Sequence, residues 1–427
     1  MQKRWVKRLA VSVSVLVGLV LLNLLFFNAT PKPKRVEAPI SLDYGVASES
    51  FQRDLVAHMG MPIVAGNRVE WLANGDEIWP AQLDAIAAAR HHVHIETFQF
   101  KAGELSERFI EVLKERLDAG VEVRFILDFM GSVEAEFSGL ADLEEAGAEV
   151  IRWRAPSPLQ LSRLNHRTHR KLLVVDGEVG FIGGANMTDD WLGPVQEGGY
   201  RDNHFRVTGP VVNQLQAAFM DNWIAASGEA LFGPAYFPVL EQVGDMVAQV
   251  VISTPREGKH RVRKFKLMAI AGAREHIRLV SAYFYPDQAV FDALLDARER
   301  GIEVDVITPG STIDKNYVRM ASRSHWGQLL EAGVRIHEYE KTMLHAKLTI
   351  IDRDLVSVGS TNLDNRSFRI NDEANLNIFD RAFAERMIEV FEADLEHTVG
   401  YDMDRWEQRG SWERLRGWAT RVVGPHL

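Results

Sequence analysis

The sequence contains no cysteine, which excludes disulfides, cysteine nucleophiles and thiolate ligands for metals. It also lacks a surplus of positive charge, because 49 Lys and Arg stand against 59 Asp and Glu, for a formal charge of −10. Residues 1–36 carry seven basic residues and no acid, so the rest of the chain holds 42 basic against 59 acidic residues, a charge of −17. Nucleic-acid binding needs a basic surface, so this composition disfavours it.

A long apolar run occurs near the N-terminus. Leu9 to Phe27 carries no charge, and a helix of that length would be roughly 28 Å long, about the thickness of a bilayer core. We therefore expect a single-pass membrane anchor, and a cleaved signal peptide is the alternative. Basic residues flank the run on both sides, and their distribution favours only weakly a body on the outer face of the membrane.

Eighteen residues of the chain recur 176 positions later. HRKLLVVDGEVGFIGGAN, from His169 to Asn186, matches HAKLTIIDRDLVSVGSTN, from His345 to Asn362. Both copies hold His-x-Lys, an aspartate seven residues after the His, and Gly-x-x-Asn. The apolar run after each Lys predicts a buried strand, followed by a turn and a second strand. Side chains at i and i+2 share one face of a strand, so each copy presents an imidazole beside an ammonium, with the Asn returning nearby.

The surrounding sequence repeats as well and predicts a duplicated α/β fold. AIAAARHHVHIETFQF, at Ala85 to Phe100, matches AIAGAREHIRLVSAYF, at Ala269 to Phe284. Strands and helices alternate in the first half, as in layered α/β domains. The expected elements are a strand at 69–72, a helix at 78–90, a strand at 93–98, a helix at 105–119 and a strand at 121–127. The expected segments are an anchor with a basic flank at 1–36, a linker at 37–67, a first domain at 68–235, a second domain at 249–400 and a Trp/Arg-rich tail at 401–427.

The doubled His-x-Lys-x4-Asp motif with its trailing Gly-x-x-Asn resembles the phospholipase D superfamily over roughly residues 68 to 400. The second copy with its flank, GSTNLDNRSFRINDEANL, resembles the cardiolipin synthases in particular. This resemblance implies two duplicated phospholipase D-like α/β sandwich domains with one active site at their pseudo-twofold interface, a natural arrangement for a duplication. It also implies a phosphatidyltransferase in the inner membrane of a bacterium. Such an enzyme joins two phosphatidylglycerols into cardiolipin and releases glycerol through a phosphatidyl-histidine.

The residues of the doubled motif suit phosphodiester chemistry without a metal or another cofactor. One neutral imidazole attacks phosphorus, and the other, protonated, gives a proton to the leaving alkoxide. The usual order in the superfamily makes His169 the nucleophile and His345 the acid and then the base. Ammonium and amide groups would hold the negative charge on the phosphate oxygens. The candidates for this role are Lys171, Lys347, Asn186 and Asn362, and Ser360 adds a hydroxyl as a further candidate phosphate contact.

The superfamily also places an acid downstream of each histidine, which orients the ring and sets its tautomer. In the second copy this acid is Glu373, 28 residues after His345, and in the first copy the best match is Asp202, 33 residues after His169. The aspartates of the motif itself, Asp176 and Asp352, are counted with the catalytic motif. A structural role for them, capping the turn or pairing across the interface, is the alternative that we favour.

Several assignments stay open at this level. Arg366 suits either a phosphate or Asp364, and Tyr283 to Pro286 suits either a lipid entrance or the core. The segment LFGPAYFP, at Leu231 to Pro238, suits an interdomain loop or a lip that touches lipid. Three tryptophans of the tail alternate with arginines and suit either the lipid interface or packing on the body. They are Trp406, Trp412 and Trp418.

Other function classes remain as alternatives to the transferase. A phospholipase D-type hydrolase would use the same residues with water as the acceptor. A nuclease is disfavoured by the charge of −17, and an inactive scaffold is disfavoured by the complete motifs. We expect a phospholipid, phosphatidylglycerol, as substrate, a membrane as partner and no nucleic acid. We expect no metal, because the histidines at His166 and His169 lack a second group of ligands.

Overall fold

The computed structural model describes residues 13, 14, 18, 36, 38–133, 135, 139–155, 165–255, 258–410, 413 and 414. Met1–Glu37 and Ala38–Leu427 form two compact units. Within the described residues, no helix has the length and apolar character needed to cross a membrane. This finding contradicts the predicted single-pass anchor and the inner-membrane location, and that prediction is corrected accordingly. Nearly all of the predicted anchor, Leu9 to Phe27, lies outside the described residues.

The first half alternates strands with helices, as the sequence predicts. In the helix α4 (Glu104–Asp118), three residues recur every four positions and are fully buried, namely Leu105, Phe109 and Leu113. They give the helix one apolar face. The elements are α2 (Glu49–Met59), β1 (Val64–Ala73), α3 (Asn74–Ala87), β2 (His92–Thr97), α4 (Glu104–Asp118), β3 (Glu122–Asp128), α5 (Leu140–Glu145), β4 (Glu149–Trp153), β5 (Leu172–Val175), β6 (Val179–Gly183), the 3-10 helices η3 (Asp189–Trp191) and η4 (Val195–Glu197), β7 (Asn203–Thr208) and α6 (Val212–Ser227).

The second half repeats this order with a few additions. The elements are β8 (Met246–Ser253), α7 (Arg261–Gly272), β9 (His276–Val280), β10 (Phe284–Tyr285), α8 (Gln288–Glu299), β11 (Glu303–Pro309), α9 (Asn316–His325), α10 (Gly327–Glu331), β12 (Arg335–Tyr339), β13 (Leu348–Ile351), β14 (Leu355–Gly359), β15 (Leu363–Asp364), α11 (Asn365–Arg369), β16 (Glu373–Phe379), α12 (Arg381–Leu395), β17 (Thr398–Tyr401) and α13 (Met403–Glu407).

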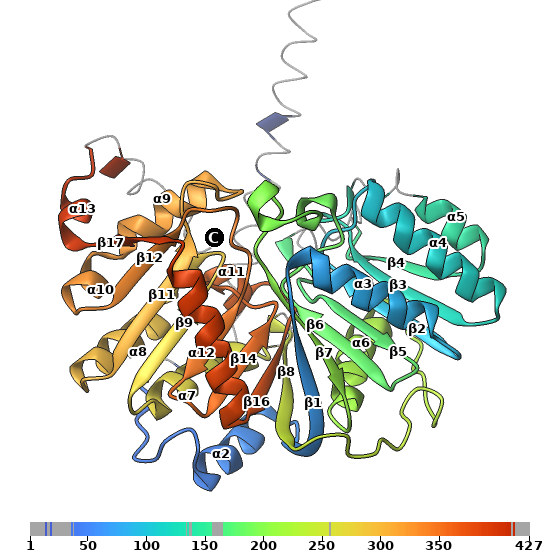
Figure 1. The fold of residues 1–427 in the computed structure, drawn as a ribbon, viewed down its shortest axis with the longest axis horizontal. Helices are drawn as coiled ribbons and strands as arrows, with labels where there is room; N and C mark the ends of the chain where they lie inside the picture. Colours follow the sequence, from blue (N-terminus) through green and yellow to red (C-terminus); the bar gives the residue numbers. More distant parts are fainter. Residues whose placement is uncertain are drawn as a thin grey trace, which may run out of the picture. The chain divides into compact units, whose positions relative to one another are not determined.

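Strands from both halves join in one 15-stranded sheet (Figure 1). The strand order is β17-β12-β11-β9-β13-β14-β16-β8-β1-β7-β6-β5-β2-β3-β4. Apart from β17, this order is the same from either edge to the centre, where β1 and β8 pair antiparallel. A pseudo-twofold axis through that pair accounts for the symmetry, so the duplicated α/β architecture is confirmed. The division into separate domains at 235 and 249 stays a prediction.

One hydrophobic core reaches across the central strand pair. Successive residues of β5 face opposite sides of the sheet, so Leu173 and Val175 pack in a cluster with residues of α3 and α4. Leu172 and Val174 pack instead in a cluster that contains residues of α6, β8, β13 and α12, such as Met387. Because this second cluster draws on both halves, the two copies are held together by buried apolar surface as well as by the sheet.

The segment predicted as a linker, 37–67, folds in part as the helix α2. Ser48 caps this helix by accepting a hydrogen bond from the backbone N–H of Phe51 at 3.1 Å. Phe51 and Leu55 are fully buried. A Cβ added at Gly272 of α7 would come within 3.2 Å of the Phe51 ring, so the helix packs closely on the second half of the chain.

The loop at Leu231 to Pro238 packs on the outer face of the first half. Leu231 is buried in a cluster with Trp153 and Trp223, and the Tyr236 hydroxyl donates to Glu122 at 2.7 Å. Phe232, by contrast, is 80% exposed. These contacts give most of the loop an ordinary packing role.

The tail tryptophan that the structure describes packs on the body. The indole Nε1 of Trp406, in α13, donates to the carbonyl of Arg323 at 2.8 Å, and a Cβ added at Gly327 would lie 2.5 Å from the Trp406 ring. Packing on the body, one of the two alternatives for the tail, therefore holds for Trp406. Trp412 and Trp418 lie outside the described residues.

The aspartates of the repeated motif anchor two equivalent turns. Asp176 follows β5 and Asp352 follows β13, both with positive φ, at 53° and 54°. Each carboxylate accepts three consecutive backbone N–H groups at the turn between a helix and the next strand, α3 to β2 and α7 to β9. The donors are Arg90, His91 and His92, at 2.8–2.9 Å, and Arg274, Glu275 and His276, at 2.8–3.2 Å. A carboxylate with three amide donors is a structural anchor.

Replacing Asp352 by Ala should lower the free energy of unfolding by about 3 kcal/mol, because three amide donors in a partly buried turn lose a charged acceptor. Urea denaturation followed by circular dichroism measures this change. Glu178→Ala is the control, since Glu178 pairs with Arg90 at the surface with half of its side chain exposed, and the expected loss there is below about 1 kcal/mol. Equal effects of the two substitutions would contradict the anchoring role.

Candidate active site

Both copies of the motif deliver their polar side chains to the same edge of the sheet. In the first half, β5, β6 and β7 are antiparallel neighbours, so the start of β5, the end of β6 and the start of β7 share one edge. The second half repeats this arrangement with β13, β14 and β16. The residues at this edge are His169, Lys171, Asn186 and Asp202 in the first half, and His345, Lys347, Asn362 and Glu373 in the second.

Backbone hydrogen bonds tie each histidine to the opposite half. The His169 N–H donates to the carbonyl of Asp372 at 2.9 Å, and the Asp372 N–H donates to the carbonyl of Arg167 at 2.8 Å. In the equivalent place, the His345 N–H donates to the carbonyl of Arg201 at 2.8 Å, and the Arg201 N–H donates to Met343 at 2.9 Å. The segment that carries each histidine therefore pairs with the segment that carries the other half's acid.

The carboxylate partners of the two rings cross between the halves. Nδ1 of His169 lies 3.0 and 3.1 Å from the two carboxylate oxygens of Glu373. Nδ1 of His345 lies 2.9 Å from the carboxylate of Asp202. The sequence identifies both acids but assigns each to the histidine of its own copy, and the structure corrects that pairing. Neither histidine has its acid partner unless both halves are folded together.

Different neighbours hold the two acids in place. Trp191 donates its indole N–H to Asp202 at 3.0 Å, and a Cβ at Gly184 would come within 2.2 Å of the Asp202 carboxylate. In the other copy, Ser360 stands at the position of Gly184 and donates its hydroxyl to Glu373. Ser360 is fully buried, so the predicted contact to phosphate is corrected to a contact with the orienting acid. Trp191 lies outside the repeated motif, and no sequence signal identifies it.

The other side chains of the motif divide between the site and the scaffold. Asp176 and Asp352, counted with the catalytic motif, lie beyond the far ends of β5 and β13, so the structure does not bring them to the histidines. The amide of Asn186 donates to Gln99 at 3.1 Å, and its oxygen has no partner among the described residues. Asn362 lines a cavity of about 120 Å³ beside His169.

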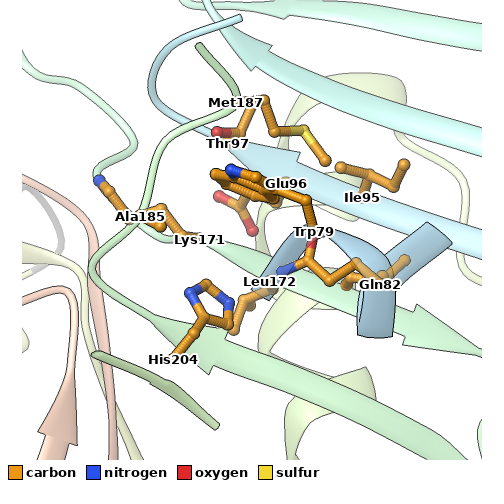
Figure 2. A pocket seen from close by; sticks show the side chains of 11 residues that line it. Trp79, Gln82, Ile95, Glu96, Thr97, Lys171, Leu172, Ala185, Met187 and His204 are labelled. Carbon is orange, nitrogen blue, oxygen red and sulfur yellow. The ribbon is translucent and has the colours of Figure 1, made fainter. Parts of the chain in front are cut away.

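The two lysines are almost fully buried. The ammonium of Lys171 donates to the carbonyl of His169 at 2.8 Å, and the ammonium of Lys347 donates to the carbonyl of His345. Burial, together with the charge of Lys347, lowers the pKa of Lys171 to about 7, and burial lowers the pKa of Lys347 to about 8. Figure 2 shows Lys171 in a pocket of about 10 Å³ with Glu96 and His204, which leaves room for about one water molecule.

The electrostatics of the two imidazoles indicate one shared site. Burial and the charges of Lys171 and Lys347 lower the pKa of His169 well below its usual value, and burial and Lys347 lower the pKa of His345 to about 4. Burial raises the pKa of Glu373 to about 8. Burial would also raise the pKa of Asp202, but the hydrogen bond and charge of His345 outweigh it and lower this pKa to about 2. The pseudo-symmetric site is therefore unequal in charge.

A possible ligand group for a metal lies elsewhere. Among the described residues, His276, Glu303 and Asp305 place ligand atoms within 4.8 Å of one another. Arg335 already pairs with both carboxylates at 2.6 Å. His276 begins β9, whereas Leu348, close after His345 in the chain, pairs with Val280 at the end of β9. The group therefore lies at the edge of the sheet opposite to the paired histidines.

The cavity beside His169 contains side chains that the sequence left open or missed. Arg366 donates to Asn165, at 2.7 Å to its carbonyl and 3.2 Å to its side chain, and Tyr283 also lines the cavity. Arg167 and Lys315 line it as well. Neither belongs to the repeated motif, so the repeat could not identify them.

Comparisons with known proteins agree with this architecture. The family described as "Cardiolipin synthase, PLD-like domain" matches residues 83–223 and 267–395. "Cardiolipin synthase 2" of Bacillus anthracis is 35% identical over 83% of this chain and 70% of its own. The cardiolipin synthase of Geobacillus thermodenitrificans is 34% identical over 86% of this chain and 74% of its own. The crystal structure of phosphatidylserine synthase from Haemophilus influenzae has the same fold, with a TM-score of 0.66 at 13% identity over 88% of this chain and 99% of that chain.

Turnover of a phosphodiester that keeps one negative charge should fall as the pH rises through about 7 to 8. A buried lysine with a lowered pKa loses its charge early in such a titration, and Lys171 and Lys347 do so at about 7 and about 8. The pH profile of kcat/KM reports groups of the free enzyme. Lys171→Arg keeps its charge throughout and should move the alkaline fall upward while lowering the maximum rate. An alkaline limb that moves equally in the control Lys114→Arg would contradict this origin.

Proposed function

The chain belongs to the phospholipase D-like cardiolipin synthase family, and from this membership and the paired site we propose that it is a phosphatidyltransferase that condenses two phosphatidylglycerols to cardiolipin and glycerol. The observation that carries the proposal is the crossed pair of carboxylate–imidazole contacts, His169 with Glu373 and His345 with Asp202. Each ring has an acid on Nδ1, so Nε2 is the atom that remains for chemistry at a shared phosphate. Nε2 of His345 lies 3.2 Å from the ammonium of Lys347, which is proposed to hold that phosphate. The relatives with this family's motif are named cardiolipin synthases.

In the first step, Nε2 of His169 forms a bond to phosphorus of the donor phosphatidylglycerol. The bond from phosphorus to the glycerol oxygen breaks, and His345 gives its Nε2 proton to that oxygen, so that neutral glycerol leaves. Lys171, Lys347, Asn186 and Asn362 hold the charge that develops on the two nonbridging oxygens. The lysines suit this role because the water-poor site strengthens each of their contacts.

In the second step, a hydroxyl of the second phosphatidylglycerol attacks the phosphatidyl-histidine. A new bond from oxygen to phosphorus forms, the bond from phosphorus to Nε2 of His169 breaks, and His345 takes the hydroxyl proton. Cardiolipin is released, and both histidines return to their starting protonation states. Water in place of the hydroxyl would give phosphatidic acid, so the outcome depends on which acceptor reaches the intermediate.

The unequal charges of the two acids support this division of roles. Asp202 stays ionised at neutral pH because its pKa is about 2. Its hydrogen bond and charge oppose the burial and the charge of Lys347, which lower the pKa of His345, and the negative charge of a bound phosphodiester would add to this support for the imidazolium that His345 needs as an acid. His169 has a pKa well below its usual value, which keeps the ring neutral as a nucleophile must be. The repeated sequence alone does not distinguish the nucleophilic histidine from the one that acts as acid and base.

Exposed apolar side chains near the cavity support contact with a lipid surface. Tyr317 lines the cavity beside His169 and is 49% exposed. Met130 and Val133 are 41% and 56% exposed, and they flank Gly131, whose added Cβ would lie 2.1 Å from the carbonyl of Phe98, another lining residue. Amphipathic and apolar side chains grouped around one opening suit the headgroup region of a membrane.

Purified protein incubated with phosphatidylglycerol in detergent micelles should form cardiolipin and glycerol in equal amounts, with phosphatidic acid as the minor product. Lipid mass spectrometry and an enzymatic glycerol assay measure the three products. Turnover should survive EDTA, because histidines, lysines and amides carry every step. His169→Ala is the inactive control. Phosphatidic acid as the main product would support the hydrolase instead.

A donor with a good leaving group separates the roles of the two histidines. Phosphatidyl-p-nitrophenol needs no proton on its departing oxygen, so His345→Ala and Asp202→Asn should still release p-nitrophenol in a burst and leave an acid-labile phosphate on His169. Glu373→Gln should lower the rate of the burst on the order of 100-fold, because it disturbs the tautomer of the nucleophilic His169. Stopped-flow absorbance and peptide mapping measure the burst and the adduct. An adduct on His345 in the wild-type protein would reverse the assignment.

A further inference from the structure

The cavity beside His169 is lined by three cations that the proposed chemistry at the donor phosphate does not use. Arg167 lies just before β5, Lys315 just before α9, and Arg366 within α11. At the 176-residue offset of the repeat, Arg167 corresponds to Met343 and Arg366 to Asp190. The positive charge therefore breaks the pseudo-twofold symmetry and gathers on the His169 side. A symmetric donor site gives no reason for such an asymmetry.

The three cations have acids nearby but, within the described residues, no salt-bridge partner. The ammonium of Lys315 lies 5.5 Å from the centre of the Tyr283 ring, and the Arg167 guanidinium lies 5.8 Å from the centre of the Phe98 ring. Burial lowers the pKa of both Lys315 and Arg366, and the charge of Arg167 lowers both further. Asp314 opposes this effect at Lys315, and Asp364 opposes it at both cations.

Acids near the cavity do not cancel this charge. Among the described lining residues, Asp364 is the one carboxylate, and it caps α11 by accepting the Ser367 N–H at 2.7 Å. Asp314, close to Lys315 in sequence, accepts the hydroxyl of Tyr283. Three cations and one carboxylate of the described residues line the cavity, while Asp314 and Asp128 act on the cations from outside the lining. An anion bound inside the cavity would meet cations that have no salt-bridge partner in the described part of the chain and would relieve their mutual repulsion.

The cavity has the size and polarity of a lipid headgroup site. Its volume is about 120 Å³, well below the roughly 300 Å³ that a drug-sized ligand occupies, so acyl chains must remain outside, where Tyr317 is exposed. The amide oxygens of Asn362 and Asn371 line the cavity, are buried, and have no partner among the described residues. They suit the hydroxyl hydrogens of a glycerol group, and the cations suit a phosphodiester.

We propose that Arg167, Lys315 and Arg366 form a second phosphate site, which binds the phosphodiester of the acceptor phosphatidylglycerol and brings its terminal hydroxyl to the phosphatidyl-histidine. The inference rests on the proposed transferase function and adds how the acceptor is chosen. An acceptor held by its own phosphate reaches phosphorus at a much higher effective concentration than water does. Selection of a lipid acceptor over water is therefore located in residues outside the repeated motif.

Two reactions of the same enzyme test this site. Cardiolipin formation uses an acceptor with a phosphate, whereas exchange of labelled glycerol into phosphatidylglycerol uses the same donor and the same intermediate with an acceptor that has no phosphate. Lys315→Gln and Arg366→Gln should each lower cardiolipin formation on the order of tenfold while glycerol exchange stays within about twofold. Lys315→Arg should retain most of the activity, because it keeps the charge. Arg381→Gln, on the exposed end of α12, is the matched control and should leave both reactions unchanged.

The possible outcomes are distinguishable. Equal losses in both reactions would mean that the cations bind the donor, and no loss in either would mean that they bind no acceptor; each result overturns the inference while the transferase stands. A wild-type protein that forms phosphatidic acid and no cardiolipin would overturn the proposed function itself. Removal of the repelling charge in Lys315→Gln should leave the melting temperature unchanged or raised, whereas Arg366→Gln also loses the hydrogen bonds to Asn165. Thermal unfolding of Lys315→Gln therefore separates a lost acceptor from a lost fold.

Discussion

The two carboxylate–imidazole contacts that cross between the halves are the constraint on which the rest of the site depends. Asp202 lies directly before β7, and Glu373 is the first residue of β16. Each acid contacts the histidine of the opposite copy. Backbone hydrogen bonds one residue before each acid fix these contacts in place. The continuous sheet and the shared core bring the two segments to that distance. A small shift of one half against the other would therefore change the tautomers of both imidazoles at once, because each imidazole is oriented by an acid of the opposite copy.

Much of this architecture could be predicted from the sequence, because it depends on local periodicity and on the repeat. The strands after Lys171 and Lys347 follow from short apolar runs, and the edge that gathers the histidines follows from the antiparallel turn within each copy. The resemblance to the superfamily also points to Asp202 and Glu373. Their crossed pairing could not be predicted, because a duplicated sequence has the same pattern whether each acid turns to its own histidine or to the other one.

The remaining errors have specific physical causes. Asp176 and Asp352 are counted with the catalytic motif because they are repeated, with a turn-capping role favoured as the alternative, and their carboxylates each accept three amide donors at a turn. Ser360 looks like a phosphate ligand, yet its hydroxyl is directed to Glu373. Arg167 and Lys315 stand outside the repeat, and only the fold brings them together beside His169. Residues that differ between the two copies of a duplicated protein are therefore the ones that the sequence repeat cannot identify.

The crossed carboxylate–imidazole contacts also determine when the active site becomes complete during synthesis of the chain. Glu373 lies 171 residues after Asp202, which a ribosome adds in roughly 10–30 s at about 5–20 residues per second. Until then, His169 is present without its carboxylate, and the second imidazole, His345, is added only 28 residues before Glu373. A half-made chain can fold its first strands and helices but has no means of cleaving a phosphodiester. The growing polypeptide therefore completes this site only once its second half has been made, and a single chain truncated before Glu373 lacks the complete site.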